Sequence, residues 1–257
     1  LPDPTSVLSI SDASEWRQID LPRKFYLGTD GAWNTPLNWL GGRVPDNQDD
    51  VFVVNGTTLV LPSSGIVCEG IEVTHNSTVA TVPNSGEVVA WGDIELGNSD
   101  TFGTLNVRPN SRLVADNLLL EKYGRATVDG GSFQAGYTQV DGSLDIENGA
   151  DFVAQKVTVG IGQSSFPCVA QTSSDVVVTG DLTLGVDGRY GRYGMSGSSS
   201  TLTVRGNEII GDTGDGVFYQ SNGTHDVTGS VRVGYGGGSD GSLTVAVVTL
   251  SAAAMGV

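Results

Sequence analysis

The sequence predicts an all-β protein whose chain winds into a right-handed parallel β-helix, or β-solenoid. The first observation is a recurring unit: an alternating apolar strand ends in glycine at residues 231–234, and a glycine-rich turn leads to a second strand at 241–245. The second is spacing, because the glycines that end four such units lie 25, 26 and 23 residues apart, a period typical of solenoids. The third is that no segment keeps a helical apolar stripe beyond two turns. The four glycines are Gly160, Gly185, Gly211 and Gly234.

A sandwich of antiparallel hairpins is the structural alternative. Hairpins favour Asn-Gly or Asp-Gly turns, and the chain has several such dipeptides, for example at 129–130 and 141–142. A hairpin protein does not predict the regular period, however, and the 63 residues from Gly97 to Gly160 are close to three units of 21. Stacked coils also explain how short strands bury their apolar residues, since like residues align about 4.8 Å apart along the axis. We therefore favour the solenoid.

Residues 1–27 are predicted to form an extended N-terminal arm. This segment has three prolines and no copy of the repeat. Its residues 7–10 alternate as a lone strand would, and a lone strand needs a partner. We expect that partner to be the protein's own solenoid, and donation of the strand to a neighbouring molecule is the alternative.

Residues 28–54 are predicted to form an aromatic cap and first coil. The first coil of a solenoid would otherwise expose its core and its open strand edges. Trp33 and Trp39 are expected to cover that end, and Pro45 to fix one of its turns. The alternative is that the two tryptophans stack on a sugar.

Residues 55–250 are predicted to form the solenoid, and an apolar C-terminal tail follows at 251–257. Two stretches break the period and are expected to be loops: residues 161–174 and the glycine-rich residues 188–195. The tail has no charged or proline-bearing cap, which indicates truncation, further domains or stacking onto another subunit.

The second loop is the predicted contact site. It gathers two arginines and two tyrosines on a turn that we expect to be flexible, in a protein that is otherwise acidic. Tyr and Arg are the residue types that dominate binding energies at interfaces. A solvated loop without a partner is the alternative. The residues are Arg189, Tyr190, Arg192 and Tyr193.

The charge of the chain limits its partners. Lys and Arg number 13 against 29 Asp and Glu, which gives a formal net charge of −16. Nucleic acids and anionic membranes both require basic surface, so neither is an expected partner. No run of 18 apolar residues occurs, and direct membrane insertion is therefore not expected. The low lysine content and the many Ser, Thr and Gly residues suit an extracellular protein at a cell surface.

No cofactor or metal site is predicted from the residue types. An acidic surface is explained by solvation alone, and Ca²⁺ binding in the Asp-rich turns is the alternative. Residues 236–243 approximate a calcium-binding β-roll repeat, but they do so once instead of in tandem. His75 and His225 are the only histidines, so a histidine-based metal site is not expected.

The two cysteines, Cys68 and Cys168, are predicted to be buried free thiols. They are 100 residues apart in the sequence, which corresponds to about four coils or roughly 20 Å along a solenoid axis. A disulfide needs Cα atoms within about 7 Å, so a bond between subunits is the alternative. Three sequons, at Asn55, Asn76 and Asn222, would carry glycans only in a eukaryotic secretory route.

No catalytic residue is predicted. Parallel β-helices include polysaccharide lyases and hydrolases, whose chemistry needs clustered carboxylates or a base. The carboxylates available for such a site are Asp129, Asp141 and Asp145, beside Lys122 and Arg125. Asp129 and Asp141 each precede a glycine, however, and turn formation explains both of them.

The first coil carries a pattern that resembles the opening segment of many bacterial surface β-solenoid proteins. The later units, such as residues 230–245, are similar to repeats of autotransporter passengers and of surface proteins with PEP-type sorting tails. The resemblance covers residues 28–250 and implies a secreted, right-handed parallel β-helix used at a cell surface, without any catalytic residue. The translocator barrel and the sorting tail of those families are not in this sequence. The opening pattern is Trp33, Asn38-Trp39, Gly42, Val44-Pro45 and Asp50-Val51.

Together these observations predict an extracellular structural or adhesive protein. We expect the subunit of a surface filament or stalk, which assembles as a homo-oligomer through its ends or its arm. The alternative is a carbohydrate-active β-helix that binds or cleaves a surface polysaccharide.

Overall fold

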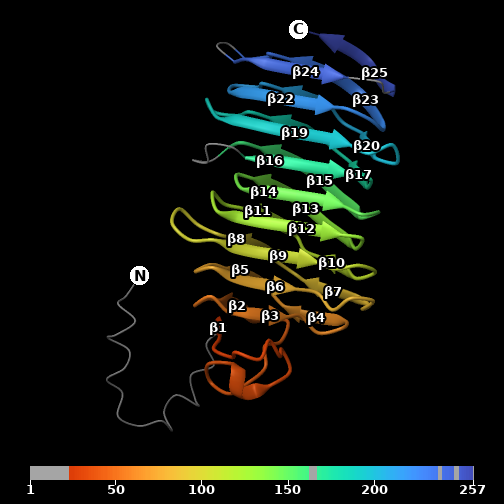
Figure 1. The fold of residues 1–257 in the computed structure, drawn as a ribbon. Coiled ribbons are helices and arrows are strands. Elements are labelled where there is room, and N and C mark those ends of the chain that lie inside the picture. The colour runs from red at the N-terminus through yellow and green to blue at the C-terminus, as the bar shows by residue number, and fades with distance from the viewer. Residues whose placement is uncertain (1–22, 162–166, 237–238, 246–248, 257) are drawn as a thin grey trace.

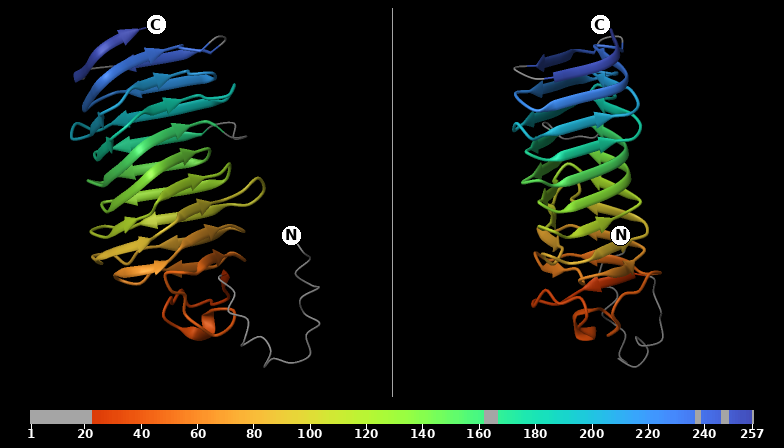
Figure 2. Two further views of the ribbon diagram at one scale, coloured as in Figure 1. Left: turned by 180° about the vertical axis from the view of Figure 1, so that it is seen from behind. Right: turned by 90° about the vertical axis from the view of Figure 1, so that its right-hand side faces the viewer.

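The protein is a parallel β-solenoid, as the sequence predicts. A computed structural model describes residues 23–161, 167–236, 239–245 and 249–256. The described strands pair in parallel throughout both sheets, and the chain climbs from β1 to β25 in a right-handed coil (Figure 1). Figure 2 shows that the strands of successive coils lie above one another along the whole stack.

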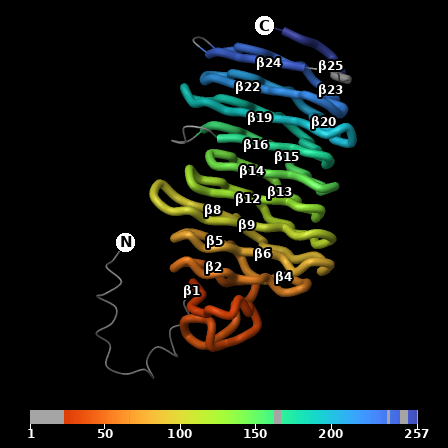
Figure 3. The backbone as a smooth tube through the Cα atoms, viewed as in Figure 1, coloured from red at the N-terminus to blue at the C-terminus, as the bar shows by residue number. Residues whose placement is uncertain are grey.

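Each coil contributes one strand to a nine-stranded sheet, so the described residues make about nine turns. The tube in Figure 3 shows these turns as a regular stack. The strands of this sheet, in spatial order, are β3 (Thr58–Val60), β6 (Ser77–Ala80), β9 (Gly103–Val107), β12 (Gly124–Asp129), β14 (Ser143–Glu147), β16 (Cys168–Thr172), β19 (Tyr190–Ser196), β22 (Asp215–Gln220) and β24 (Gly241–Val245).

The rest of each coil crosses a sixteen-stranded sheet, either as two short strands or as one long strand. The long strand β13, for example, pairs with both β10 and β11 of the coil before it. The strands of this sheet are β1 (Arg23–Tyr26), β2 (Asp50–Val53), β4 (Gly65–Cys68), β5 (Gly70–Val73), β7 (Glu87–Ala90), β8 (Asp93–Leu96), β10 (Arg112–Val114), β11 (Asn117–Leu120), β13 (Ser132–Val140), β15 (Asp151–Val159), β17 (Asp175–Val178), β18 (Leu182–Leu184), β20 (Thr201–Val204), β21 (Glu208–Ile210), β23 (Thr224–Val233) and β25 (Thr249–Gly256).

The register confirms the predicted spacing of the units. Leu96 pairs with Leu120, Leu120 with Val140, and Val140 with Val159, so three coils separate Gly97 from Gly160. Because side chains alternate between the two faces of a strand, a fixed register places like residues in columns.

The core is built from these columns. In the nine-stranded sheet, Leu105, Ala126, Leu144 and Val169 follow one another in register, and all four are buried. Leu243 continues the same series in β24 and is partly buried against the core. The apolar positions of the repeat therefore point inward, which excludes the antiparallel sandwich.

The segment between β1 and β2 lies at the end of the stack beside the first coil (Figure 1). Its aromatic side chains pack together and against Tyr26 of β1. Trp39 lies edge-on to Tyr26 and to Trp33, with ring centroids 5.2 and 5.0 Å apart. The indole Nε1 of Trp39 donates a hydrogen bond to the backbone oxygen of Trp33. A short 3-10 helix (Pro36–Asn38) precedes Trp39, and Pro45 is buried. This geometry supports our proposal that the segment caps the solenoid.

Replacement of Trp39 by alanine should therefore loosen the first coils. Deletion of a buried tryptophan side chain costs about 3–5 kcal/mol, and Trp39 is 2% exposed. Hydrogen exchange of the β1 and β2 amides should accelerate, since each coil contacts only its neighbours. Trp91→Ala is the matched control because Trp91 is 50% exposed; equal exchange in the two variants would contradict the capping role.

Four predicted boundaries or loops are wrong. Residues 23–26, assigned to the arm, form β1 and pair with β2. The supposed loop at 161–174 contains β16, the loop at 188–195 contains most of β19, and the tail at 251–257 contains most of β25. The physical reason is the same each time: these residues satisfy their backbone groups by pairing with the coil before them. The predicted lone strand at 7–10 lies outside the described residues.

Candidate functional site

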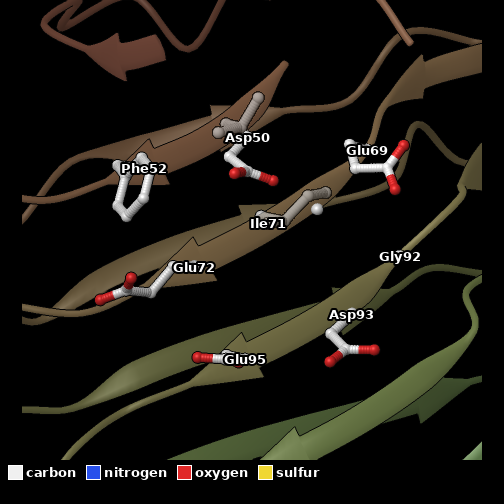
Figure 4. Close-up of a pocket in the computed structure, with 10 residues that line it drawn as sticks. Asp50, Phe52, Glu69, Ile71, Glu72, Gly92, Asp93 and Glu95 are labelled. Atoms are coloured by element: carbon white, nitrogen blue, oxygen red, sulfur yellow. The ribbon is translucent and has the colours of Figure 1, made fainter. Parts of the chain in front are cut away.

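An acidic hollow, here called the acidic groove, lies across three consecutive coils. It has a volume of about 350 Å³ and runs over β2, β5 and β8. Five carboxylates line it, and Figure 4 shows them on one face of these neighbouring strands. They are Asp50, Glu69, Glu72, Asp93 and Glu95.

The parallel register explains why these carboxylates gather. Glu72 and Glu95 are paired positions of β5 and β8, so their side chains lie one above the other. Gly70 pairs with Asp50 and carries no side chain. A Cβ built on Gly70 would lie 3.4 Å from Asp50 Oδ1 and 3.2 Å from the Asp93 backbone oxygen. The missing side chain therefore leaves the hollow between the two aspartates.

Among the described residues, none of the five carboxylates of the groove belongs to an ion pair. Burial raises the pKa of Glu95 above its ordinary value, and the charges of Glu72, Asp93, Glu121 and Asp50 raise it further. Asp93 accepts a hydrogen bond of 2.6 Å from the Asn117 amide. Among the described residues, no group of three or more His, Cys, Asp or Glu side chains is arranged to hold a metal ion.

Substitution Glu95→Gln should stabilise the protein at pH 7. A raised pKa means that the native state holds the Glu95 proton more tightly, so stability falls as pH rises from about 4.5 through the folded pKa. The expected gain is on the order of 0.5 kcal/mol, because water screens this half-exposed charge. Denaturation should show the gain at pH 7 and little of it at pH 4.5. Glu147→Gln controls for net charge; an equal gain in that variant would contradict the groove's role.

The predicted contact residues do not form a flexible loop. Tyr190, Arg192 and Tyr193 lie in β19, which pairs with β16 and β22, and Arg189 directly precedes this strand. Arg192 is exposed, and Arg189 and Tyr190 are half-buried. Tyr193 points into the core instead, where its hydroxyl donates a 2.7 Å hydrogen bond to Gln171 Oε1 and its ring stacks on Phe218. The side chain of Tyr193 is therefore not available to a partner.

The carboxylates considered for catalysis are held in structural contacts. Asp141 is buried and accepts hydrogen bonds from the Ile161 backbone N–H at 2.7 Å and from the Gln139 amide at 2.8 Å. Asp129 accepts one from Asn148. The register pairs Asp129 with Glu147 and Asp145 with Thr127, so the predicted aspartates do not oppose one another.

Lys122 and Arg125 do lie together, and the structure adds two aromatic rings that the sequence analysis missed. Phe102 and Tyr123 pack with their centroids 4.9 Å apart. Arg125 lies over Phe102 and Lys122 over Tyr123. The register of three coils brings the starts of β9, β12 and β14 side by side. Knowledge of this register would have predicted that the two rings lie beside Lys122 and Arg125.

The cysteines agree with the prediction in part. Both cysteines are free, as expected, but Cys168 is only half-buried. Burial raises the pKa of the Cys68 thiol strongly. The asparagines of the three sequons are exposed, namely Asn55, Asn76 and Asn222.

Comparison with known proteins places the chain in no family. No family model matches it, and no curated protein or solved structure is significantly similar to it. The resemblance to bacterial surface solenoid proteins therefore stays a prediction. In the part of the chain that the structure describes, no helix has the length and apolar character needed to cross a membrane.

Proposed function

We propose that this protein is an extracellular structural or adhesive protein of a cell surface, in which the solenoid serves as a stalk or as a filament subunit. The uniform stack of coils is the observation that carries the proposal. Nine strands at about 4.8 Å spacing give a rod roughly 40 Å long. Its core runs continuously along the axis, as a rigid spacer requires.

The last described coil supports assembly along the rod axis. Among the described strands, β24 pairs only with β22, and β25 pairs only with β23. Met255 is 63% exposed, although Val231, its partner position in β23, is fully buried. Ala252 packs only partly against the core. Any further β layer on this coil, from the same polypeptide or from another copy, would lengthen the rod.

Analytical ultracentrifugation and negative-stain electron microscopy of the purified chain test the filament version. End-to-end particles should appear and grow with concentration. Ala252→Asp should suppress them, because it places a charge in the inward column of β25. Ala253→Asp is the control, since Ala253 is exposed. Monomers alone at every concentration would contradict the proposal that the protein is a filament subunit, and the proposal of a stalk would remain.

The alternative is a carbohydrate-active β-helix. The contacts described above support polysaccharide binding by this protein but not polysaccharide cleavage. The aspartates considered for cleavage are engaged in turns and strand contacts, and the register separates them. The juxtaposition of Lys122 and Arg125 with two aromatic rings favours recognition of an acidic polysaccharide instead.

A further inference from the structure

A second hollow, here called the aromatic–basic groove, lies at the starts of β9, β12 and β14. Its volume is about 210 Å³. It lies at the corner where the chain leaves the sixteen-stranded sheet and enters the nine-stranded one. The groove is lined by Phe102, Lys122, Tyr123, Gly124, Arg125, Gly142 and Ser143.

The side chains of this groove form one composite surface. The rings of Phe102 and Tyr123 are tilted by 55° with their centroids 4.9 Å apart. The Arg125 guanidinium carbon lies 5.1 Å from the Phe102 centroid, and Lys122 Nζ lies 4.9 Å from the Tyr123 centroid. Each cation therefore stays beside an apolar ring face, where cation–π attraction holds it.

The charge of the groove differs from that of the protein as a whole. The chain has a net charge of −16 and only 13 Lys and Arg residues, yet two of these, Lys122 and Arg125, line this groove. Among the described residues, neither Lys122 nor Arg125 belongs to an ion pair, whereas Arg112 is paired with Glu87 at 2.6 Å and Arg43 with Asp46. Two cations beside exposed aromatic carbon suit a ligand that combines a carboxylate with an apolar face.

We propose that the aromatic–basic groove binds a uronate unit of an acidic polysaccharide. Arg125 and Lys122 bind the carboxylate, Arg125 through the planar donor fork that matches it. Phe102 and Tyr123 contact the C–H face of the sugar ring. Ser143, whose position pairs with Arg125 in the next coil, adds a hydroxyl to the lining of the groove.

The shape of the groove favours one unit of a longer chain over an enclosed small molecule. Its volume is below the roughly 300–1,000 Å³ of pockets that enclose drug-sized ligands. Gly124 and Gly142 form part of its wall and project no side chain, so a polymer can continue across neighbouring coils. Nucleic acid is a poorer fit, since its binding needs several basic contacts to successive phosphates.

Calorimetric titration of the purified protein tests the proposal independently of assembly and of the surface role. The probe is tetragalacturonate in 0.15 M salt with EDTA, which excludes bridging by divalent cations; its methyl ester is the neutral match. We expect binding of the acid and none of the ester. Arg125→Gln and Lys122→Gln should each weaken binding about tenfold, the effect of losing one charge-assisted hydrogen bond.

Arg205→Gln is the matched control, because Arg205 is exposed, directly follows β20 and does not line the groove. Unchanged affinity in that variant supports the groove, and unchanged melting of all variants shows that they fold. The proposal is overturned if tetragalacturonate does not bind, if the three variants lose affinity equally, or if a glutamate tetrapeptide binds as well as the saccharide.

Discussion

Replacement of Glu208 alone by leucine is expected to destabilise the protein by about 3–5 kcal/mol, the cost of removing one partner of a buried carboxylate–histidine pair. Glu208 and His225 are fully buried, and His225 Nε2 lies 3.1 Å from Glu208 Oε2. This contact does not have hydrogen-bond geometry, and the described residues offer none of the four polar atoms of the two side chains a hydrogen-bond partner. Removal of the carboxylate takes away the acceptor that lies 3.1 Å from the buried imidazole.

The surroundings of this pair are apolar, which makes the loss severe. Glu208 lies between Leu182 and Val231 in register, and His225 pairs with Leu202 of the coil before it. The His225 ring stacks on Phe218 with centroids 4.7 Å apart. Burial, and then the charge of Glu208, raises the pKa of Tyr193 well above its ordinary value.

The double variant Glu208→Leu/His225→Leu should instead match or exceed the stability of the parent protein. Its two leucines continue the apolar columns, and apolar replacement of a whole buried pair is often neutral or stabilising by about 1–4 kcal/mol. Urea denaturation of the single and double variants gives the coupling energy directly. Glu87→Leu breaks a half-exposed ion pair and should cost less than about 1 kcal/mol. A Glu208→Leu variant as stable as Glu87→Leu would show that the buried pair contributes nothing.

The second large effect is expected from Gly191→Ala. Gly191 occupies a corner column, and a Cβ built there would overlap the backbone oxygen of Val159 in the coil before it. Backbone atoms of a packed coil cannot move aside cheaply, so we expect a loss of about 3 kcal/mol, at the upper end of overpacking costs. The column has Ser77 beside Gly103 and Pro167 between Gly142 and Gly191. Its other members named here are glycines, at Gly103, Gly124, Gly142, Gly191, Gly216 and Gly241.

Gly194→Ala is the matched control for this prediction. It lies in the same strand three residues later, and the nearest atom to its added Cβ is the Val169 backbone oxygen at 4.0 Å. This variant should be neutral or slightly stabilising, because alanine has less freedom to lose on folding. Thermal melting of both variants decides the question: equal melting points would mean that the corner has room for a side chain.

The fold could be predicted from the sequence because each coil repeats the same local rules. The alternating strands and the period gave the number of coils between Gly97 and Gly160, and the register confirms it. The strand β19 was missed because Gly191 and Gly194 weaken the alternation, although Tyr193 and Met195 both point inward. From a single sequence, a glycine that is required at a corner of a coil cannot be distinguished from a glycine in a flexible loop.

The surface sites could not be predicted in the same way. The acidic groove depends on residues 20 or more positions apart, such as Glu72 and Glu95, which meet only once the register is known. Glu208 precedes two isoleucines and would be expected to face water, but the register turns it into the core. The functional surfaces of a solenoid are formed by residues of several neighbouring coils, so the sequence of one coil does not reveal them.

Distances between spin labels in one outward column test the stacked register most directly. Thr58, Ser143 and Ser242 belong to the same column of the nine-stranded sheet. Labels would be introduced as cysteines in a Cys168→Ser background, since Cys68 is buried. Four coils separate residues 58 and 143, and eight separate 58 and 242, so the distances should be about 19 and 38 Å. A second distance that is not close to twice the first would contradict the solenoid.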